Sequence, residues 1–405
     1  MNKIDFYQNE SKLKTIQQLD KSGNKETLYI ALREYVSNFG IENFRKNVPM
    51  LWQLAELSRT YGQEGESRIL FKLAIRHHQQ GVDISNLLKV YDSIETDKKE
   101  YYVPLDFYYQ LVDYRKEIDT LRPPHAVLLN MGMEVNSTEE DYGPSIGLND
   151  DVLLFTSKRN QHFHGMERVF DEDLFYTRYE YGAWSKAEEF RNINSTFNEG
   201  SACLSLDGKQ LFFSRCMTPE SIGHCDIYQS TLQADSTWSV PVNLGANVNS
   251  PVWDSHPSLT HSGDTLFFAS SRAGGFGMSD IYFSVKDKEG NWQKAMNAGP
   301  VINTVQSEVS PFFHHTYDVL YFSSDGHPLN FGKFDIYKSY YTPDGWSEPL
   351  NIGPLVNGPG SEYYFTIEGQ SKNLYYSRSE QEDLKNMDLF SFPVPMGAKP
   401  DAVTL

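Results

Sequence analysis

The sequence predicts a multidomain α and β protein, in which an N-terminal α-helical domain precedes a five-bladed β-propeller. Two observations carry this prediction. In the last three quarters of the chain, tryptophans recur every 54 residues, each ten to twelve residues after a triplet of acidic, aliphatic and aromatic residues. The first 120 residues lack this unit and show helical spacing instead. Repeats of this length are typical of propellers and arrays. The repeated residues are Trp184, Trp238, Trp292 and Trp346, and the triplets begin at Asp173, Asp226, Asp280, Asp335 and Asp388.

The third repeat shows what one unit forms. Two short apolar segments flank a turn at Ser262, Gly263 and Asp264, which is the pattern of a β-hairpin. A Gly-rich connection leads to residues 281–285, a third strand, and Trp292 opens a fourth stretch. Four strands in each unit indicate a propeller blade.

The ends of the repeat region set the number of blades. The fifth unit meets Pro393 and Pro395 after its third strand and has no outer strand of its own. Upstream of the first unit, residues 128–132 match the outer-strand ending of the other units. We therefore expect residues 125–132 to complete the fifth blade, because the ring then closes without an open sheet edge. Six blades are the alternative.

The N-terminal part has the pattern of amphipathic helices. Residues 27–36 and 48–57 carry apolar residues three to four positions apart. Glycines between these segments are expected to end helices, at Gly40, Gly62, Gly65 and Gly81. The predicted boundaries are residues 1–120 for the helical domain, 121–397 for the propeller and 398–405 for the start of a following segment.

Composition excludes some classes of function. The net charge of −18 disfavours nucleic acid as a partner, because phosphates would be repelled. No apolar run approaches the length of a membrane span. The N-terminus has no apolar signal core, so the protein is either cytosolic or an exported protein whose leader is missing from this sequence. Cys216 and Cys225 flank one connection in the second unit, where they form a disulfide in an oxidising compartment or remain two free thiols.

The repeat resembles a known family. An acid and a proline, an Asp-Gly turn, Leu-Phe-Phe-Ser, Gly-x-Gly, Asp-Ile-Tyr and a final Trp to Asn-Leu-Gly stretch follow one another in residues 199–245 and 254–299. This order resembles the PD40, WD40-like repeat of TolB-type envelope proteins. With tetratricopeptide-like helices in front, the chain is similar to PorE-like proteins of the type IX secretion system. The family's C-terminal OmpA-like domain has no counterpart in this sequence, so peptidoglycan anchoring is not carried over.

One acid recurs at the same phase in each unit, usually three residues before the proline. If the following segment is the innermost strand, these carboxylates form a ring at one mouth of the central channel, where they bind a divalent cation or a Lys/Arg-rich partner segment. The alternative is that arginines after the second strand neutralise the acids. The acids are Asp141, Glu199, Asp254, Glu308 and Glu362, and the arginines are Arg159, Arg215, Arg272 and Arg378.

Two further sets of residues receive structural interpretations. The acid of each triplet recurs in all five units, which favours a role in holding the blade together over catalysis. The repeat tryptophans are expected to pack between blades. His162, His164 and Glu167 suggest a metal site, but they lie in an insertion that we interpret as a solvated loop. His256 is interpreted as a hydrogen-bonded structural residue.

The repeated residues favour a non-enzymatic protein-binding scaffold, because catalysis needs unique, non-equivalent groups. The resemblance implies an adaptor in the periplasm or at the outer membrane, which binds protein partners through the helical domain and one propeller face. Membrane association would then come through a partner or a missing lipid anchor. A propeller-type glycoside hydrolase or carbohydrate-binding protein is the alternative, and it requires two or three non-equivalent carboxylates converging on the channel.

Overall fold

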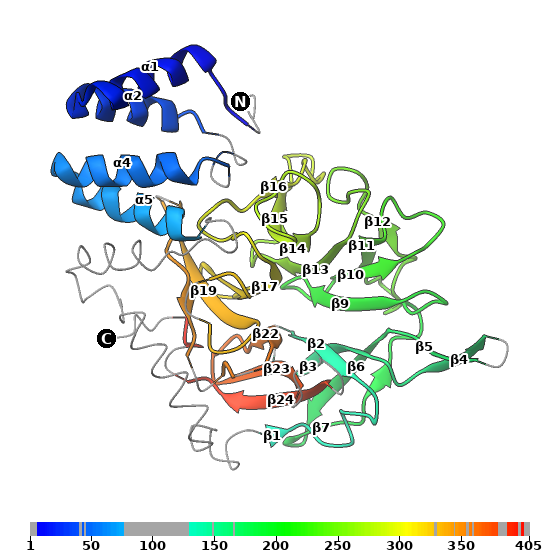
Figure 1. The fold of residues 1–405 in the computed structure, drawn as a ribbon. Coiled ribbons are helices and arrows are strands. Elements are labelled where there is room, and N and C mark those ends of the chain that lie inside the picture. The colour runs from blue at the N-terminus through cyan, green and yellow to red at the C-terminus, as the bar shows by residue number, and fades with distance from the viewer. Residues whose placement is uncertain are drawn as a thin grey trace.

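The computed structural model describes residues 6–39, 43, 46–76, 129–147, 150–164, 167–327, 330–343, 345–353, 356–358, 360–379, 387–395 and 398–400. Within these residues, helices occupy the N-terminal part and strands the remainder (Figure 1). The predicted helix ends at Gly40 and Gly81 lie outside the described residues, as do residues 125–128 of the predicted closing strand.

The N-terminal helices form two successive helical hairpins around one apolar core. Asn9 caps α1 by accepting a hydrogen bond from the Lys12 amide, and Gly23 ends that helix in the left-handed conformation. Leu32 and Phe71 are fully buried in the shared core. The helices are α1 (Glu10–Ser22), α2 (Lys25–Val36), α4 (Val48–Thr60) and α5 (Glu64–Arg76).

The predicted end at Gly62 is confirmed, because Gly62 follows α4 with a φ of 74°. The predicted end at Gly65 is wrong. Gly65 is the second residue of α5 and therefore lies in the first turn of that helix. The first turn needs no side chain and tolerates glycine.

Five antiparallel sheets surround a central axis and form a five-bladed propeller (Figure 1). In the first four blades the strands run outward from the axis in chain order. Blade 1 contains β2 (Asp141–Ile146), β3 (Val152–Ser157), β6 (Asp173–Glu180), β7 (Ala183–Trp184) and β8 (Glu188–Glu189). Blade 2 contains β9 (Glu199–Leu204), β10 (Gln210–Cys216), β11 (Cys225–Thr231) and β12 (Val242–Asn243). Blade 3 contains β13 (Asp254–Leu259), β14 (Thr265–Ser270), β15 (Asp280–Val285) and β16 (Met296–Asn297). Blade 4 contains β17 (Glu308–Phe313), β18 (Val319–Ser324), β19 (Asp335–Thr342), β20 (Gly345–Trp346) and β21 (Leu350–Asn351).

The fifth blade joins the two ends of the propeller sequence. Its inner strands are β22 (Glu362–Ile367), β23 (Asn373–Ser379) and β24 (Met387–Pro393), and its outer strand is β1 (Leu129–Asn130). β1 is antiparallel to β24, with Leu129 opposite Ser391 and Asn130 opposite Phe390. The predicted closure is therefore confirmed in its described part, residues 129–130.

An additional hairpin projects from blade 1, formed by β4 (Gln161–His164) and β5 (Glu167–Phe170), which pair only with each other (Figure 1). The interpretation of this insertion as a loop is wrong, because residues 161–164 and 167–170 form a regular two-stranded ladder.

The apolar cores of the propeller lie between neighbouring blades. Phe267 of blade 3 stacks on Phe313 of blade 4, with ring centroids 5.5 Å apart. Phe312 of blade 4 packs edge-on against Phe365 of blade 5, with ring centroids 6.3 Å apart. Each blade therefore buries its apolar face only when the next blade is present, as expected for repeat architectures.

Candidate functional site: the channel and the disulfide loop

The five aligned acids begin the innermost strands of the five blades. All five are fully buried, with no exposed surface: Asp141, Glu199, Asp254, Glu308 and Glu362. Their positions agree with the common phase found in the sequence. Their burial means that they do not form an exposed ring at the channel mouth.

Asp254 shows how such a buried carboxylate is satisfied. It accepts hydrogen bonds from the backbone amide and hydroxyl of Ser250, each at 2.6 Å, and from Arg272 at 2.6 Å. Arg272 also donates to the carbonyl of Val248, so one guanidinium links the second strand to the segment that enters the blade. The same ion pairs occur between Arg159 and Asp141 at 2.6 Å and between Arg215 and Glu199 at 2.7 Å.

Blade 4 satisfies its acid differently. Glu308 accepts hydrogen bonds from the amide and hydroxyl of Thr304 and from the hydroxyl of Ser324. Gly326 stands where blades 1 and 3 carry arginine. Burial raises the pKa of Glu308 to about 8.

The acids of blades 2 and 5 complete the comparison. Burial also raises the pKa of Glu199, although hydrogen bonds from Ser195 and the charge of Arg215 oppose this shift. Glu362 accepts a hydrogen bond from the amide of Gly358 and lies opposite Arg378 in the strand register. In blades 1 to 3 the arrangement is the neutralising alternative set out from the sequence, and binding of a cation or a basic segment by these acids stays a prediction.

The channel wall is formed two residues after each acid. There the inner strand adopts a left-handed backbone, with φ between 50° and 67°, and its pairing with the second strand shifts register. A bulge of this kind turns one residue out of the ladder and toward the axis. These residues are Gly143, Ser201, His256, Ser310 and Tyr364, and together with their neighbours they line a cavity of about 40 Å³.

A side-chain bridge crosses this cavity. His256 Nδ1 accepts a hydrogen bond from the backbone amide of Ser310 at 3.1 Å, and Nε2 lies 3.1 Å from the hydroxyl oxygen of Tyr364. Because Nδ1 is an acceptor, the proton resides on Nε2, which donates to Tyr364. Burial lowers the pKa of His256 to about 3, so the ring is neutral at physiological pH. Side chains from blades 3 and 5 thus close the middle of the channel.

The acids of the triplets tie the third strand to its surroundings. Asp226 accepts hydrogen bonds from the amides of Ile222 and Gly223 and from the side chain of Asn243 on the outer strand. Asp280 and Asp335 make the corresponding three contacts in blades 3 and 4. Asp173 and Asp388 accept hydrogen bonds from the side chains of Asn160 and Asn130.

A second set of side chains that hold each blade together was not predicted from the sequence. Asn249 pairs through both side-chain atoms with the backbone of Ile227, at 2.8 and 3.0 Å. The same pairing recurs in every blade, at Asn136, Asn194, Asn249, Asn303 and Asn357. The available signal was an asparagine six residues after the outer-strand asparagine, present in four of the five units.

The repeat tryptophans lie at the junctions between blades. Trp292 is 9% exposed and packs edge-on against Phe212 of the preceding blade, at 6.0 Å between ring centroids. Trp346 and Trp184 make similar contacts with Phe267 and Tyr375. Trp238 is only partly buried and packs against Phe190.

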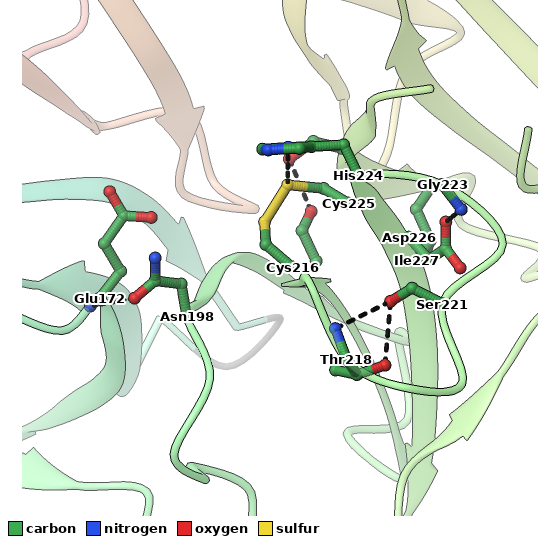
Figure 2. Close-up of a disulfide and its surroundings, with 12 residues drawn as sticks. Glu172, Asn198, Cys216, Thr218, Ser221, Gly223, His224, Cys225, Asp226 and Ile227 are labelled. Atoms are coloured by element: carbon green, nitrogen blue, oxygen red, sulfur yellow. Dashed lines mark hydrogen bonds between the residues drawn. A yellow bond between two sulfur atoms is a disulfide. The ribbon is translucent and has the colours of Figure 1, made fainter. Parts of the chain in front are cut away.

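Cys216 and Cys225 form a disulfide, with Cα atoms 3.9 Å apart (Figure 2). They are direct partners in the register of β10 and β11, at the end of the blade that also holds the buried acid. The bridge closes the loop of residues 217–224. Within that loop the hydroxyls of Thr218 and Ser221 lie 2.9 Å apart, and the Asp226 carboxylate accepts two loop amides.

The loop also packs directly on the segment that enters blade 3. The amide of His224 donates to the carbonyl of Val252 at 2.9 Å. A Cβ atom on Gly223 would lie 2.1 Å from that same carbonyl oxygen, so only glycine permits this approach. Three of the exposed side chains on this loop and segment are large and apolar, whereas Glu220 and His224 of the loop are exposed and polar. Met217 is 68% exposed and Ile222 and Val252 are each 38% exposed, and we call these three residues the disulfide-loop patch.

Within the described ranges, no group of three or more His, Cys, Asp and Glu side chains is placed to hold a metal ion. No helix in the described part of the chain combines the length and apolar character needed to cross a membrane.

No protein-family model matches the sequence, and no curated protein matches it. Among solved structures, TolB from Acinetobacter baumannii is 13% identical with a TM-score of 0.39, and the match covers 64% of this chain and 56% of that chain. The Bacillus subtilis arabinanase is 13% identical with a TM-score of 0.36, covering 65% of this chain and 97% of that chain. A glycoside hydrolase is 10% identical with a TM-score of 0.45, covering 74% and 100%. The chain therefore spans little more than half of the Acinetobacter TolB, and at these values the similarities carry no argument about function.

Proposed function

We propose that this protein is a non-enzymatic protein-binding scaffold of the bacterial cell envelope, acting as an adaptor in a type IX-like secretion or outer-membrane machine. Its helical part is a tetratricopeptide-like module, and the helices and one propeller face each bind a protein partner. The chain is exported and resides in the periplasm or at the outer membrane.

The disulfide-loop patch is the observation that carries the proposal. Exposed apolar side chains that the fold holds in place can form an interaction surface. Here Met217 and Ile222 lie on a loop closed by a disulfide, and a hydrogen bond from His224 joins that loop to Val252. Binding to a rigid surface loses little conformational entropy.

The disulfide also supports export. Structural disulfides form and persist in oxidising compartments and are rare in the bacterial cytosol. The resemblance of the repeat to TolB-type envelope proteins points in the same direction. A periplasmic adaptor satisfies both observations.

The buried acids weigh against the glycoside hydrolase alternative. Such an enzyme needs two carboxylates that both reach the sugar. The five aligned carboxylates have no exposed surface, and the His256–Tyr364 bridge closes the channel beside them. We therefore propose no catalytic activity for the channel.

The test is affinity capture from solubilised envelope membranes with the full-length chain. The double variant Met217→Asp with Ile222→Asp places two charges on the patch and should abolish capture of the propeller partner. The matched control is Met133→Asp, because Met133 is 96% exposed but lies after β1 in the fifth blade. Ile30→Asp with Ile69→Asp tests the helices in the same way, since each of these isoleucines is 60% exposed.

Both double variants should melt at the wild-type temperature, because the substituted side chains are exposed. Capture that is equal for wild type and both double variants would exclude these surfaces as binding sites. Turnover of an envelope glycan by the purified chain would contradict the non-enzymatic role.

A further inference from the structure

Three of the five junctions between blades share one packing pattern. A tryptophan from the outer part of one blade packs against an aromatic ring on the second strand of the preceding blade. The centroid distance is 6.0 Å for Trp292 with Phe212, 5.9 Å for Trp346 with Phe267, and 5.7 Å for Trp184 with Tyr375.

At the junction of blades 1 and 2 this ring is missing from the second strand. Leu154 occupies the position that Phe212 holds in blade 2. The aromatic residue at this junction is Phe190, which follows the outer strand of blade 1 at the position that Leu244 holds in blade 2. Phe190 packs on Trp238 at 5.8 Å, and Leu154 is buried in the same apolar cluster.

An open groove of about 1270 Å³ lies at this junction, between blades 1 and 2. It lies between the β2–β3 and β9–β10 turns, at the opposite end of the strands from the disulfide loop. Leu154, Phe190, Leu204 and Trp238 provide its apolar lining. We call it the Trp238 groove.

The charges around the Trp238 groove are unequal. Four carboxylates line it, from Asp151, Glu188, Glu189 and Asp207, against two guanidiniums, from Arg178 and Arg191. One guanidinium is already engaged in part, because Arg191 lies 3.9 Å from Glu189. The rim is therefore net negative on a chain whose total charge is −18.

We infer that the Trp238 groove binds an extended peptide segment of a partner, with an aromatic or large aliphatic side chain beside Phe190 and Trp238, and with lysine or arginine flanking it. These two partly buried rings line the groove and offer the anchor an apolar contact, and the basic flanks match the acidic rim. This inference rests on the proposed protein-binding function and assigns it a second surface, separate from the disulfide-loop patch.

The test uses a random peptide library displayed on phage, selected against the full-length protein. Enriched peptides should combine an aromatic or large aliphatic residue with nearby basic residues. Their binding should weaken at least about tenfold, or about 1.4 kcal/mol, in the double variant Leu154→Phe with Phe190→Leu. That variant copies the Phe212 and Leu244 pair of the next junction, so it removes the Phe190 ring from the groove lining while it conserves side-chain volume.

Three controls make the result specific. The reciprocal variant Phe212→Leu with Leu244→Phe alters the neighbouring junction and should leave binding unchanged. Asp207→Asn should weaken the basic peptides, whereas Asp264→Asn, which removes the same turn-capping carboxylate from blade 3, should not. Trp238→Ala should abolish binding even if the double variant fails to fold.

Failure to enrich any peptide would overturn the inference. So would enriched peptides that bind the Leu154→Phe, Phe190→Leu variant as tightly as the wild type. Neither outcome affects the disulfide-loop patch, because its variants are scored separately by envelope capture.

Discussion

Replacing two equivalent tryptophans should give unequal losses of stability. Trp292 and Trp238 occupy the same place in successive blades, but only Trp292 is enclosed by the preceding blade. A buried tryptophan removes about 150–250 Å² from water. At about 25 cal/mol per Å², this corresponds to roughly 4–6 kcal/mol.

For Trp292→Ala we therefore expect a loss of about 3–5 kcal/mol, the range measured for large aromatic residues in cores. The Lys286 ammonium lies 4.6 Å from the centre of this ring and adds to the loss. For Trp238→Ala we expect about 2 kcal/mol, because one side of its ring faces the groove and water can occupy the space it leaves.

The assay is urea unfolding of the full-length chain, monitored by the circular dichroism of the sheet. The unfolding free energies of the variants are compared at one common slope against urea concentration. Losses that agree within about 0.5 kcal/mol would refute the difference between the two junctions. A loss below about 1 kcal/mol for Trp292 would refute its role in blade packing altogether.

Three other changes test the closure and the buried acids. Deleting residues 125–132 should unfold blade 5 and lower the melting temperature strongly, since β24 loses β1, its outer partner. Deleting the β4–β5 hairpin, residues 161–170, is the control and should be tolerated. Equal effects of the two deletions on the melting temperature would count against the closure. Arg272→Met should cost about 3–5 kcal/mol of stability, because it leaves the buried Asp254 carboxylate uncompensated. Calcium or magnesium should leave the wild-type melting temperature unchanged. Stabilisation by either cation would support the hypothesis of a cation site at the channel mouth. Glu308 has a pKa raised to about 8 in the fold from 4.5, so the folded state holds a proton that the unfolded chain releases between these values, and stability should fall as pH rises from 5 to 9. Glu308→Gln should lose that part of the pH dependence, and parallel wild-type and variant curves would contradict the assignment.

Periodicity in the sequence was enough to predict the blades and their closure. Three patterns in the sequence reflect backbone pairing, which repeats from blade to blade. They are the 54-residue spacing, the acid-aliphatic-aromatic triplets and the outer-strand ending near Asn130. The phase of Asp141, Glu199, Asp254, Glu308 and Glu362 was also correct, because each of them starts an innermost strand. The tetratricopeptide-like character of the helices stays a prediction.

The surroundings of these residues were harder to predict. Whether a carboxylate faces the channel or its own blade depends on the reach of an arginine such as Arg272, which strand spacing does not reveal. The bulge that turns His256 toward Tyr364 has no fixed residue type, since glycine, serine, histidine and tyrosine all occupy it. The Trp238 groove is lined by Phe190 and Trp238, which pack on each other across a junction, and the sequence shows this only when the positions that face a junction are known.

The pairing of β1 with β24 also determines how the propeller responds to mechanical tension. The two strands are antiparallel, so the chain that enters β1 and the chain that leaves β24 depart from the same end of the seam. A pull on both would peel the seam open one residue pair at a time instead of shearing all its hydrogen bonds at once. Among the described residues two pairs form the ladder, and the Asn136 contacts with Leu389 are the next to resist. Under load the ring would therefore open first at this seam, while the other four blades stay intact.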